Sequence, residues 1–426
     1  MKESSTAKSR GSAWAWLVLL GCIGFYSIPT GVIANTSGIF VAPVMDQFGW
    51  TQTDTTMYRT IQPLVSAVLA PFAGKLLQKG NPRVILAIVS AAFGLSSWAS
   101  AYATEIWQWN LYGVVFGITA AFFMYLAMPV IVNNWFKKSN GTAVAICAAT
   151  LSLLAAVASP VGQALITQYG WQTARAILSA FTLISSVLLT VLFVRKDPVE
   201  MGLLPWGATS DEIAKDAEEN HGAEHEESGA SISDALKSPA LYTLILVCMI
   251  FVMCAAFFQQ IPTFCAHGTL GAGAGAIAVS IIMVGGIVGK LILGGLNDII
   301  GVQNTGIIAA LGGGLGIALA WQSGSNVAVF YAGMGIFGLG YAGLTVIAPM
   351  LARAAFGSKN YAQIYSWCST GIFIASAIAF LVYGLIYDIT GSFDMSFLLV
   401  IALYVLAAIL VPFTVKVGRR TWKRCK

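Results

Sequence analysis

Long apolar runs are the feature of this sequence that most restricts its fold. Hydrophobic residues make up 57% of the 426 residues and charged residues only 10%, whereas a soluble domain carries about 25% charged residues. Runs long enough to cross a bilayer, about 20 residues, recur along the whole chain. Because backbone polar groups must be satisfied internally in lipid, we expect an all-α membrane protein. Twelve transmembrane helices are expected, at about residues 14–43, 54–77, 84–103, 108–133, 141–167, 172–194, 240–264, 274–296, 304–323, 327–351, 362–387 and 396–416.

The positive charges predict how the chain is oriented. Twenty of the 23 Lys and Arg residues lie in the two tails, in the central polar segment or in loops on the same side as these. The loops on the opposite side carry none. Cytoplasmic loops are enriched in Lys and Arg, so both termini are expected in the cytoplasm. We expect an integral protein of a bacterial inner membrane.

A polar segment divides the chain into two halves. Residues 195–238 hold eleven acidic and four basic residues, a composition typical of a solvated linker. The expected domains are therefore 1–194 and 239–426, joined by this linker. His221 and His225 have a spacing that could place two metal ligands on one helical face, but such a linker offers no ordered site. We expect neither a metal nor a cofactor.

The two halves resemble each other at a constant offset. Four landmarks in the first half recur 220 or 221 positions later. This repeat predicts a duplicated six-helix unit, hence two pseudo-symmetric six-helix bundles. The matched positions are Gly74 with Gly294, Phe116-Gly117 with Phe337-Gly338, Pro129 with Pro349, and Gly170 with Gly391.

One loop carries a family signature. GGLNDIIG at 294–301 resembles the G-x-L-x-D-x-x-G loop of the major facilitator superfamily, and GKLLQKGNPR at 74–83 resembles its degenerate first-half copy. The resemblance implies the major facilitator fold and a cytoplasmic gate containing Asp298, Gly294, Gly74 and Arg83. Gln78 stands where the signature has an aspartate, so the first copy lacks the carboxylate on which the charge-based role depends.

Other segments resemble the oxalate/formate antiporter and monocarboxylate transporter branch of that superfamily. They are 38–55, 133–146, 169–178 and 387–393. The resemblance implies that Lys290 binds a substrate carboxylate, because it matches the branch's cation in the eighth span. The eleventh span has no lysine, unlike oxalate-specific members, which favours a monocarboxylate over oxalate.

The position of Lys290 supports this role independently. It lies eight residues before Asp298, or about 12 Å along a helix. If Asp298 marks the inner membrane surface, Lys290 lies near the middle of the bilayer's hydrocarbon core, which is about 30 Å thick. No acidic residue falls at the centre of any expected span. The bound substrate would therefore supply the counter-charge, either by exchange of two anions or together with a proton.

Further polar or aromatic side chains lie inside expected spans. Arg59 could contact substrate, extend outward to water, or pair with Asp54 or Asp46, whereas Arg175 is expected to be structural. A carboxylate would satisfy some of these groups, although each could instead serve helix packing. The remaining candidates for substrate binding are Tyr26, Asn35, Tyr125, Gln260, Tyr341 and Trp367.

These features predict a secondary active transporter of small organic anions, expected to act as a monomer in the bilayer. An exporter of drugs or neutral solutes is an alternative, which would be insensitive to Lys290. A non-transporting membrane sensor is another, but the linker and short tails offer no output domain. No nucleophile–base set, metal-ligand spacing or phosphate-binding loop indicates an enzyme, and nothing suggests nucleic-acid binding.

Overall fold

The computed structural model describes residues 14–198, 201–207, 231–357 and 360–423. Within these ranges the chain is almost entirely helical, and the only β-type pairing is an isolated bridge between Phe136 and Trp206. Nine of the described helices are long and apolar enough to cross a membrane. Two of these nine are far longer than one bilayer requires.

Glycines divide the two longest helices. α7 (Asn140–Phe193) is interrupted at Gly170, which has φ 80°, and α12 (Ala272–Trp321) at Gly301, which has φ 76°. Glycine adopts these left-handed angles readily because it has no Cβ. Each element is therefore two helices joined by a sharp turn, as expected from the predicted boundaries near residues 167–172 and 296–304.

Three predicted spans contain irregular helix. The first has π-helical turns η1 (Ile23–Ser27) and η2 (Pro29–Ala34), followed by η3 (Ser37–Phe40). The fourth runs through α5 (Ile106–Phe122), η5 (Phe123–Ala127) and α6 (Met128–Trp135). The seventh is α10 (Pro239–Ala256), η7 (Phe257–Gln260) and α11 (Ile261–His267). Such turns are frequent at functional sites.

The chain forms two compact units. Unit 1 comprises Met1–Thr36, Val65–Ala158 and Leu165–His225. In its core, α4 (Pro82–Ala99) packs on α5 and η5. The ring centroid of Phe93 lies 5.1 Å from that of Phe116 in α5 and 5.3 Å from that of Phe123 in η5. These contacts bury large aromatic side chains between adjacent helices.

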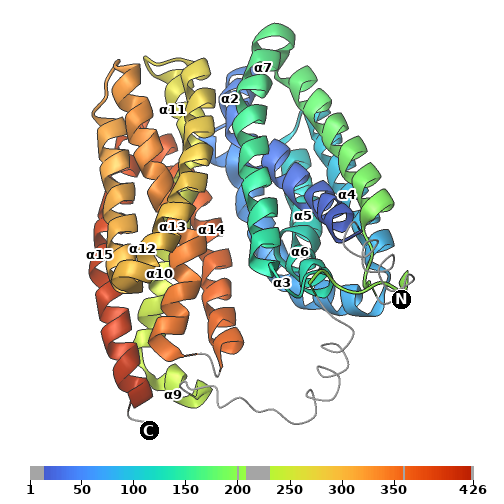
Figure 1. Cartoon of the computed structure of the whole chain (residues 1–426). Coiled ribbons are helices and arrows are strands. Elements are labelled where there is room, and N and C mark those ends of the chain that lie inside the picture. Colours follow the sequence, from blue (N-terminus) through green and yellow to red (C-terminus); the bar gives the residue numbers. More distant parts are fainter. Residues whose placement is uncertain (1–13, 199–200, 208–230, 358–359, 424–426) are drawn as a thin grey trace. The chain divides into compact units, whose positions relative to one another are not determined.

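Unit 2 comprises Ser37–Leu64, Ser159–Ala164 and Glu226–Lys426. In Figure 1 its helices α10, α12, α13 (Val327–Phe356), α14 (Tyr361–Thr390) and α15 (Asp394–Lys423) form one bundle. Small residues bring α12 and α13 together: a Cβ on Gly338 would lie 2.6 Å from the carbonyl carbon of Gly285. This close packing is typical of membrane helices.

Unit 2 also includes a segment from the N-terminal part of the chain. Ser37–Leu64 contains α2 (Val41–Phe48) and the start of α3 (Gln52–Lys79). The predicted division into halves 1–194 and 239–426, joined by the linker 195–238, is based on the sequence repeat and not on tertiary contacts. It remains a prediction. Residues 208–230 of that linker, with His221 and His225, lie outside the described residues. The linker's described C-terminal part contains α9 (Ile232–Lys237).

Candidate functional site

Lys290 lies in the first half of α12, within unit 2. Its side chain is half-buried. Among the described residues, no hydrogen-bond or ion-pair partner of its ammonium group is found. A charge in this setting is costly unless it is paired, so an anionic ligand would be stabilised beside it.

Tyr341 on α13 packs one helical turn away from Lys290. Its ring lies against Gly286, where an added Cβ would be 2.9 Å from Cδ1 of Tyr341. The ring of Phe258 meets it edge-on, with centroids 5.5 Å apart. Gly286 and Lys290 are four residues apart and so share one face of α12. Tyr341 therefore packs on the face of α12 that carries Lys290, one turn before the lysine.

Arg59 on α3 is the second cation of this region. It is only 8% exposed, so its side chain does not reach out to water. Its guanidinium carbon lies 5.0 Å from the ring centroid of Phe380 on α14, a cation–π contact. It also interacts electrostatically with Tyr341. Tyr341 thus connects the surroundings of Arg59 to the helix that carries Lys290.

Two glutamines extend this polar region. The Nε2 of Gln52 donates to the Oε1 of Gln260 at 2.6 Å, and both side chains are buried. The second amide donor, Nε2 of Gln260, has no hydrogen-bond partner among the described residues. Gln52 precedes Arg59 by seven residues, or two turns of α3. A buried donor without a partner is costly and would favour a ligand oxygen.

Of the other predicted substrate residues, Trp367 belongs to unit 2 and the remaining three belong to unit 1. Trp367 is 50% exposed and lies thirteen residues before Phe380, about 20 Å along α14. Tyr26, Asn35 and Tyr125 belong to unit 1. Asn35 is buried there, and the side chain of Tyr125 lies outside the described residues. A substrate role for all four remains a prediction.

The predicted gate residues differ in their surroundings. Asp298 is exposed and makes no ion pair with a described residue. A Cβ on Gly294 would meet no described atom within 4 Å. Gly74 lines a cavity of about 270 Å³ in unit 1. The gating role of these residues remains a prediction.

Arg83, the fourth predicted gate residue, is anchored within unit 1. Its Nε donates to the carbonyl of Val191 at 2.6 Å, which fixes the start of α4 to the end of α7. Burial, and then the nearby charge of Arg83, lower the pKa of Arg195. Arg83 at the start of α4 and Arg195 just after α7 therefore lie close together.

Three residues around Tyr341, Arg59 and Gln260 are not predicted from the sequence. Phe258 and Phe380 sit in apolar runs without any distinguishing signal, and Gln52 precedes the span expected to begin at residue 54. Only the tertiary contacts with Tyr341, Arg59 and Gln260 identify them. A search for buried amides near span ends could have found Gln52.

Comparison with known families identifies the class of protein. The sequence model of the Major Facilitator Superfamily matches residues 23–320 and 269–424. The chain therefore belongs to this superfamily. The prediction of an all-α membrane protein with the twelve-helix major facilitator fold is confirmed, and the chain is a transporter-family protein rather than an enzyme.

Individual relatives are more distant. The chain is 26% identical to monocarboxylate transporter 4 of Rattus norvegicus over 181 residues, which cover 41% of this chain and 37% of the rat protein. It is 25% identical to the MFS-type transporter pytF of Aspergillus terreus over 309 residues, or 70% of this chain and 95% of that protein. The predicted resemblance to monocarboxylate transporters is thus confirmed as weak homology.

Solved structures support the fold alone. The nucleoside transporter NupG matches with a TM-score of 0.71 at 13% identity, covering 93% of this chain and 98% of NupG. A bacterial homologue of the human lysosomal transporter Spinster matches with a TM-score of 0.67, also at 13% identity, covering 96% and 97% of the two chains. Neither likeness bears on substrate.

Proposed function

We propose that this chain is a secondary active transporter of small organic anions, with monocarboxylates as its main substrate class. The observation that carries the proposal is Lys290, a half-buried cation within a membrane helix without a counter-ion among the described residues. The weak homology to monocarboxylate transporters supports the same substrate class.

The surroundings of Lys290 suggest how a carboxylate would bind. The ammonium group donates to one carboxylate oxygen, and the hydroxyl of Tyr341 is available as a second donor. Charge-assisted hydrogen bonds of this kind are about twice as strong as neutral ones. Arg59 contributes positive potential near Tyr341, and the amide of Gln260 offers a further donor.

The same surroundings favour a monocarboxylate over a small dianion. Phe258 and Phe380 present aromatic rings next to Tyr341 and Arg59, and these rings suit an apolar substituent. The eleventh span has no Lys or Arg that would meet a second carboxylate. Oxalate, which has two charges and no apolar part, fits this combination poorly.

Substrate binding would couple to transport through charge. Without a bound anion, closure of the transporter would bring the charged ammonium group of Lys290 into a dehydrated environment, which costs free energy. A bound carboxylate neutralises this charge and removes the cost. Exchange of two anions and symport of an anion with a proton both satisfy this requirement. Anion uptake into proteoliposomes with and without a pH gradient separates them.

The orientation and assembly state belong to the same proposal. The charge distribution favours both termini in the cytoplasm, and we expect the transporter to work as a monomer in a bacterial inner membrane. Thiol labelling of single cysteines introduced near Lys8 and Lys138, from each side of sealed vesicles, tests the orientation. Labelling from the external side would contradict it.

Thermal stabilisation by carboxylates tests the substrate class. Ligand binding to the native state raises stability by mass action. Formate, lactate, pyruvate, oxalate and a neutral solute would be added to wild type, Lys290→Gln and the control Lys237→Gln, which changes an exposed lysine at the end of α9.

We expect monocarboxylates to stabilise wild type and Lys237→Gln but not Lys290→Gln. Equal stabilisation of Lys290→Gln would remove Lys290 as the anion-binding group. Stabilisation by neutral solutes alone would favour the exporter alternative.

A further inference from the structure

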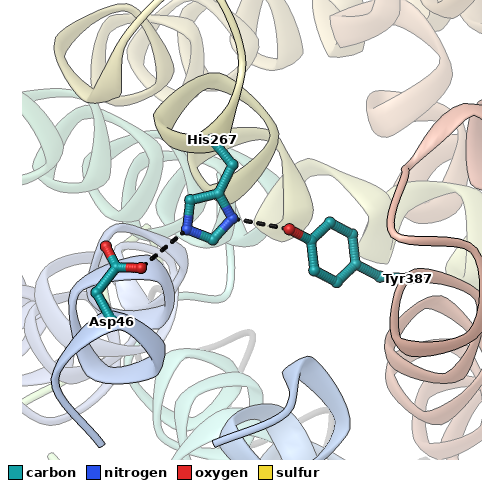
Figure 2. Close-up of polar contacts among 3 residues, drawn as sticks. All are labelled: Asp46, His267 and Tyr387. Atoms are coloured by element: carbon teal, nitrogen blue, oxygen red, sulfur yellow. Dashed lines mark hydrogen bonds and ion pairs between the residues drawn. The ribbon is translucent and has the colours of Figure 1, made fainter. Parts of the chain in front are cut away.

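His267 occupies a position between two parts of unit 2. It ends α11, with Asp46 of α2 on one side and Tyr387 of α14 on the other (Figure 2). Its Nε2 lies 3.3 Å from Oδ1 of Asp46, and its Nδ1 lies 2.9 Å from the hydroxyl of Tyr387. Both ring nitrogens are therefore engaged, each by a different helix.

A second contact joins the same segments next to this one. Asp388, which follows Tyr387, accepts hydrogen bonds from the backbone N–H groups of Gln52 at 2.8 Å and Thr53 at 3.0 Å. These N–H groups belong to the first turn of α3, where they have no partner within the helix. A carboxylate there is favoured by both hydrogen bonding and the helix dipole. α14 thus caps α3 across 336 positions of sequence.

The backbones of these helices also approach closely. A Cβ on Gly384 of α14 would lie 2.9 Å from the Cα of Thr53. We call Asp46, His267, Tyr387 and Asp388 the latch, because together they hold α2 and the start of α3 against α11 and α14. The latch lies at the end of unit 2 that the charge distribution predicts to be external.

We propose that His267 is a proton-binding site and that its protonation tightens the latch. A neutral imidazole can donate from Nε2 to Asp46 and accept at Nδ1 from the Tyr387 hydroxyl. Protonation makes both nitrogens donors, so the Tyr387 oxygen accepts instead. Both contacts persist, and the proton adds a charge–charge attraction to the Asp46 carboxylate.

The direction of the pH effect follows from these two states. An imidazole changes charge between about pH 5 and pH 8, whereas an ordinary aspartate stays ionised above about pH 4. Because the added proton brings a positive charge next to the Asp46 carboxylate, protonation of the imidazole tightens the latch and a rise in pH loosens it. The ion pair is partly exposed, with 28% of the His267 side chain and 70% of the Asp46 side chain accessible. A pair so exposed to solvent changes the equilibrium only modestly, by about two- to fivefold.

Few other titratable groups face His267. Of the elements packed against α11, η3 and η7 contribute none, and α12 contributes none before Lys290. The titratable or charged groups near His267 on the surrounding elements are Asp46, Tyr387, Asp388, Cys265, Tyr331 and Asp394. Aspartate, cysteine and tyrosine side chains ordinarily change charge outside the range from about pH 5 to pH 8.

Electron paramagnetic resonance distances between two spin labels test the proposal. Labels would replace Gln47 on α2 and Ile389 on α14, which are both exposed, in a chain that also carries Cys425→Ser. The six other cysteines are buried. The distance distribution is recorded from pH 5.5 to pH 8.5 in the absence of any carboxylate.

We expect the ratio of the short-distance to the long-distance population to fall about two- to fivefold as the pH rises. His267→Gln, which keeps a donor and an acceptor but cannot titrate in this range, should remove the pH dependence. Asp46→Asn should reduce it, as a second variant independent of the histidine. His221→Gln and His225→Gln are matched controls and should behave like wild type.

A flat pH response in wild type would overturn the proposal. An unchanged response in His267→Gln would do the same, because another group would then be titrating. The measurement contains no anion, so its outcome is separate from that of the proposed carboxylate transport.

Discussion

The fold gives two cations of the predicted spans very different surroundings: Arg175 in unit 1 and Lys290 in unit 2. Arg175 is 2% exposed, its Nε donates to the Ser100 hydroxyl at 2.6 Å, and its guanidinium carbon lies 4.6 Å from a ring of Trp109. Lys290 is only half-buried and has no hydrogen-bond or ion-pair partner among the described residues. A cation surrounded by partners stabilises the fold, whereas one without them is available to a ligand.

The largest expected effect is on the structural cation. Arg175→Gln should lower the free energy of unfolding by about 2–4 kcal/mol, because a charged hydrogen bond and cation–π contacts are lost together. Thermal unfolding in detergent measures this loss. Arg175→Lys should not rescue it, since an ammonium group cannot reproduce the planar contact with Trp109. If Arg175→Gln left the free energy of unfolding unchanged but weakened anion binding, Arg175 would be the ligand-binding cation and the account would be wrong.

The next effect concerns anion affinity. Lys290→Gln should weaken binding of a monocarboxylate about 10- to 100-fold, the range expected when a charged hydrogen-bonding partner is removed. The unfolding temperature without ligand should stay equal or rise, since a desolvated charge has been removed. Isothermal titration of purified protein gives the affinity, and the same sample gives the unfolding temperature. A large loss of stability would place Lys290 in the same structural class as Arg175.

A smaller effect is expected at Tyr341, which packs against the helix that carries Lys290. Tyr341→Phe keeps the ring against Gly286 and Phe258 but removes the hydroxyl. Anion affinity should fall about two- to tenfold, corresponding to one hydrogen bond, with little change in stability. Tyr383→Phe is the matched control, because the Tyr383 hydroxyl already donates to the carbonyl of Met253 at 2.9 Å. Equal affinity losses in both variants would argue against a direct role for Tyr341.

Much of the fold was predictable because it follows from local sequence. Apolar runs of bilayer length determine the helices, and Gly170 and Gly301 end helices where left-handed angles are required. Lys290 was recognisable because a single lysine in an apolar run needs an explanation. These inferences depend on residues close together in the chain.

The rest of the site depends on contacts between distant residues. In the sequence, nothing distinguishes Phe380 from the other aromatic residues. Its role becomes visible only because Arg59, 321 positions away in sequence, lies over its ring. Nothing in the sequence around Asp388 predicts that its carboxylate caps the start of α3. The grouping of Ser37–Leu64 with the C-terminal helices follows the same pattern, since such pairings leave no periodic signal.

Exchange of a labelled monocarboxylate in proteoliposomes tests most directly whether Lys290 binds the transported anion. Wild type, Lys290→Arg, Lys290→Gln and Lys237→Gln would be reconstituted at equal protein density, with unlabelled substrate inside. We expect exchange in wild type and Lys237→Gln, partial exchange in Lys290→Arg, and none above background in Lys290→Gln. Wild-type exchange rates in Lys290→Gln would contradict the central claim.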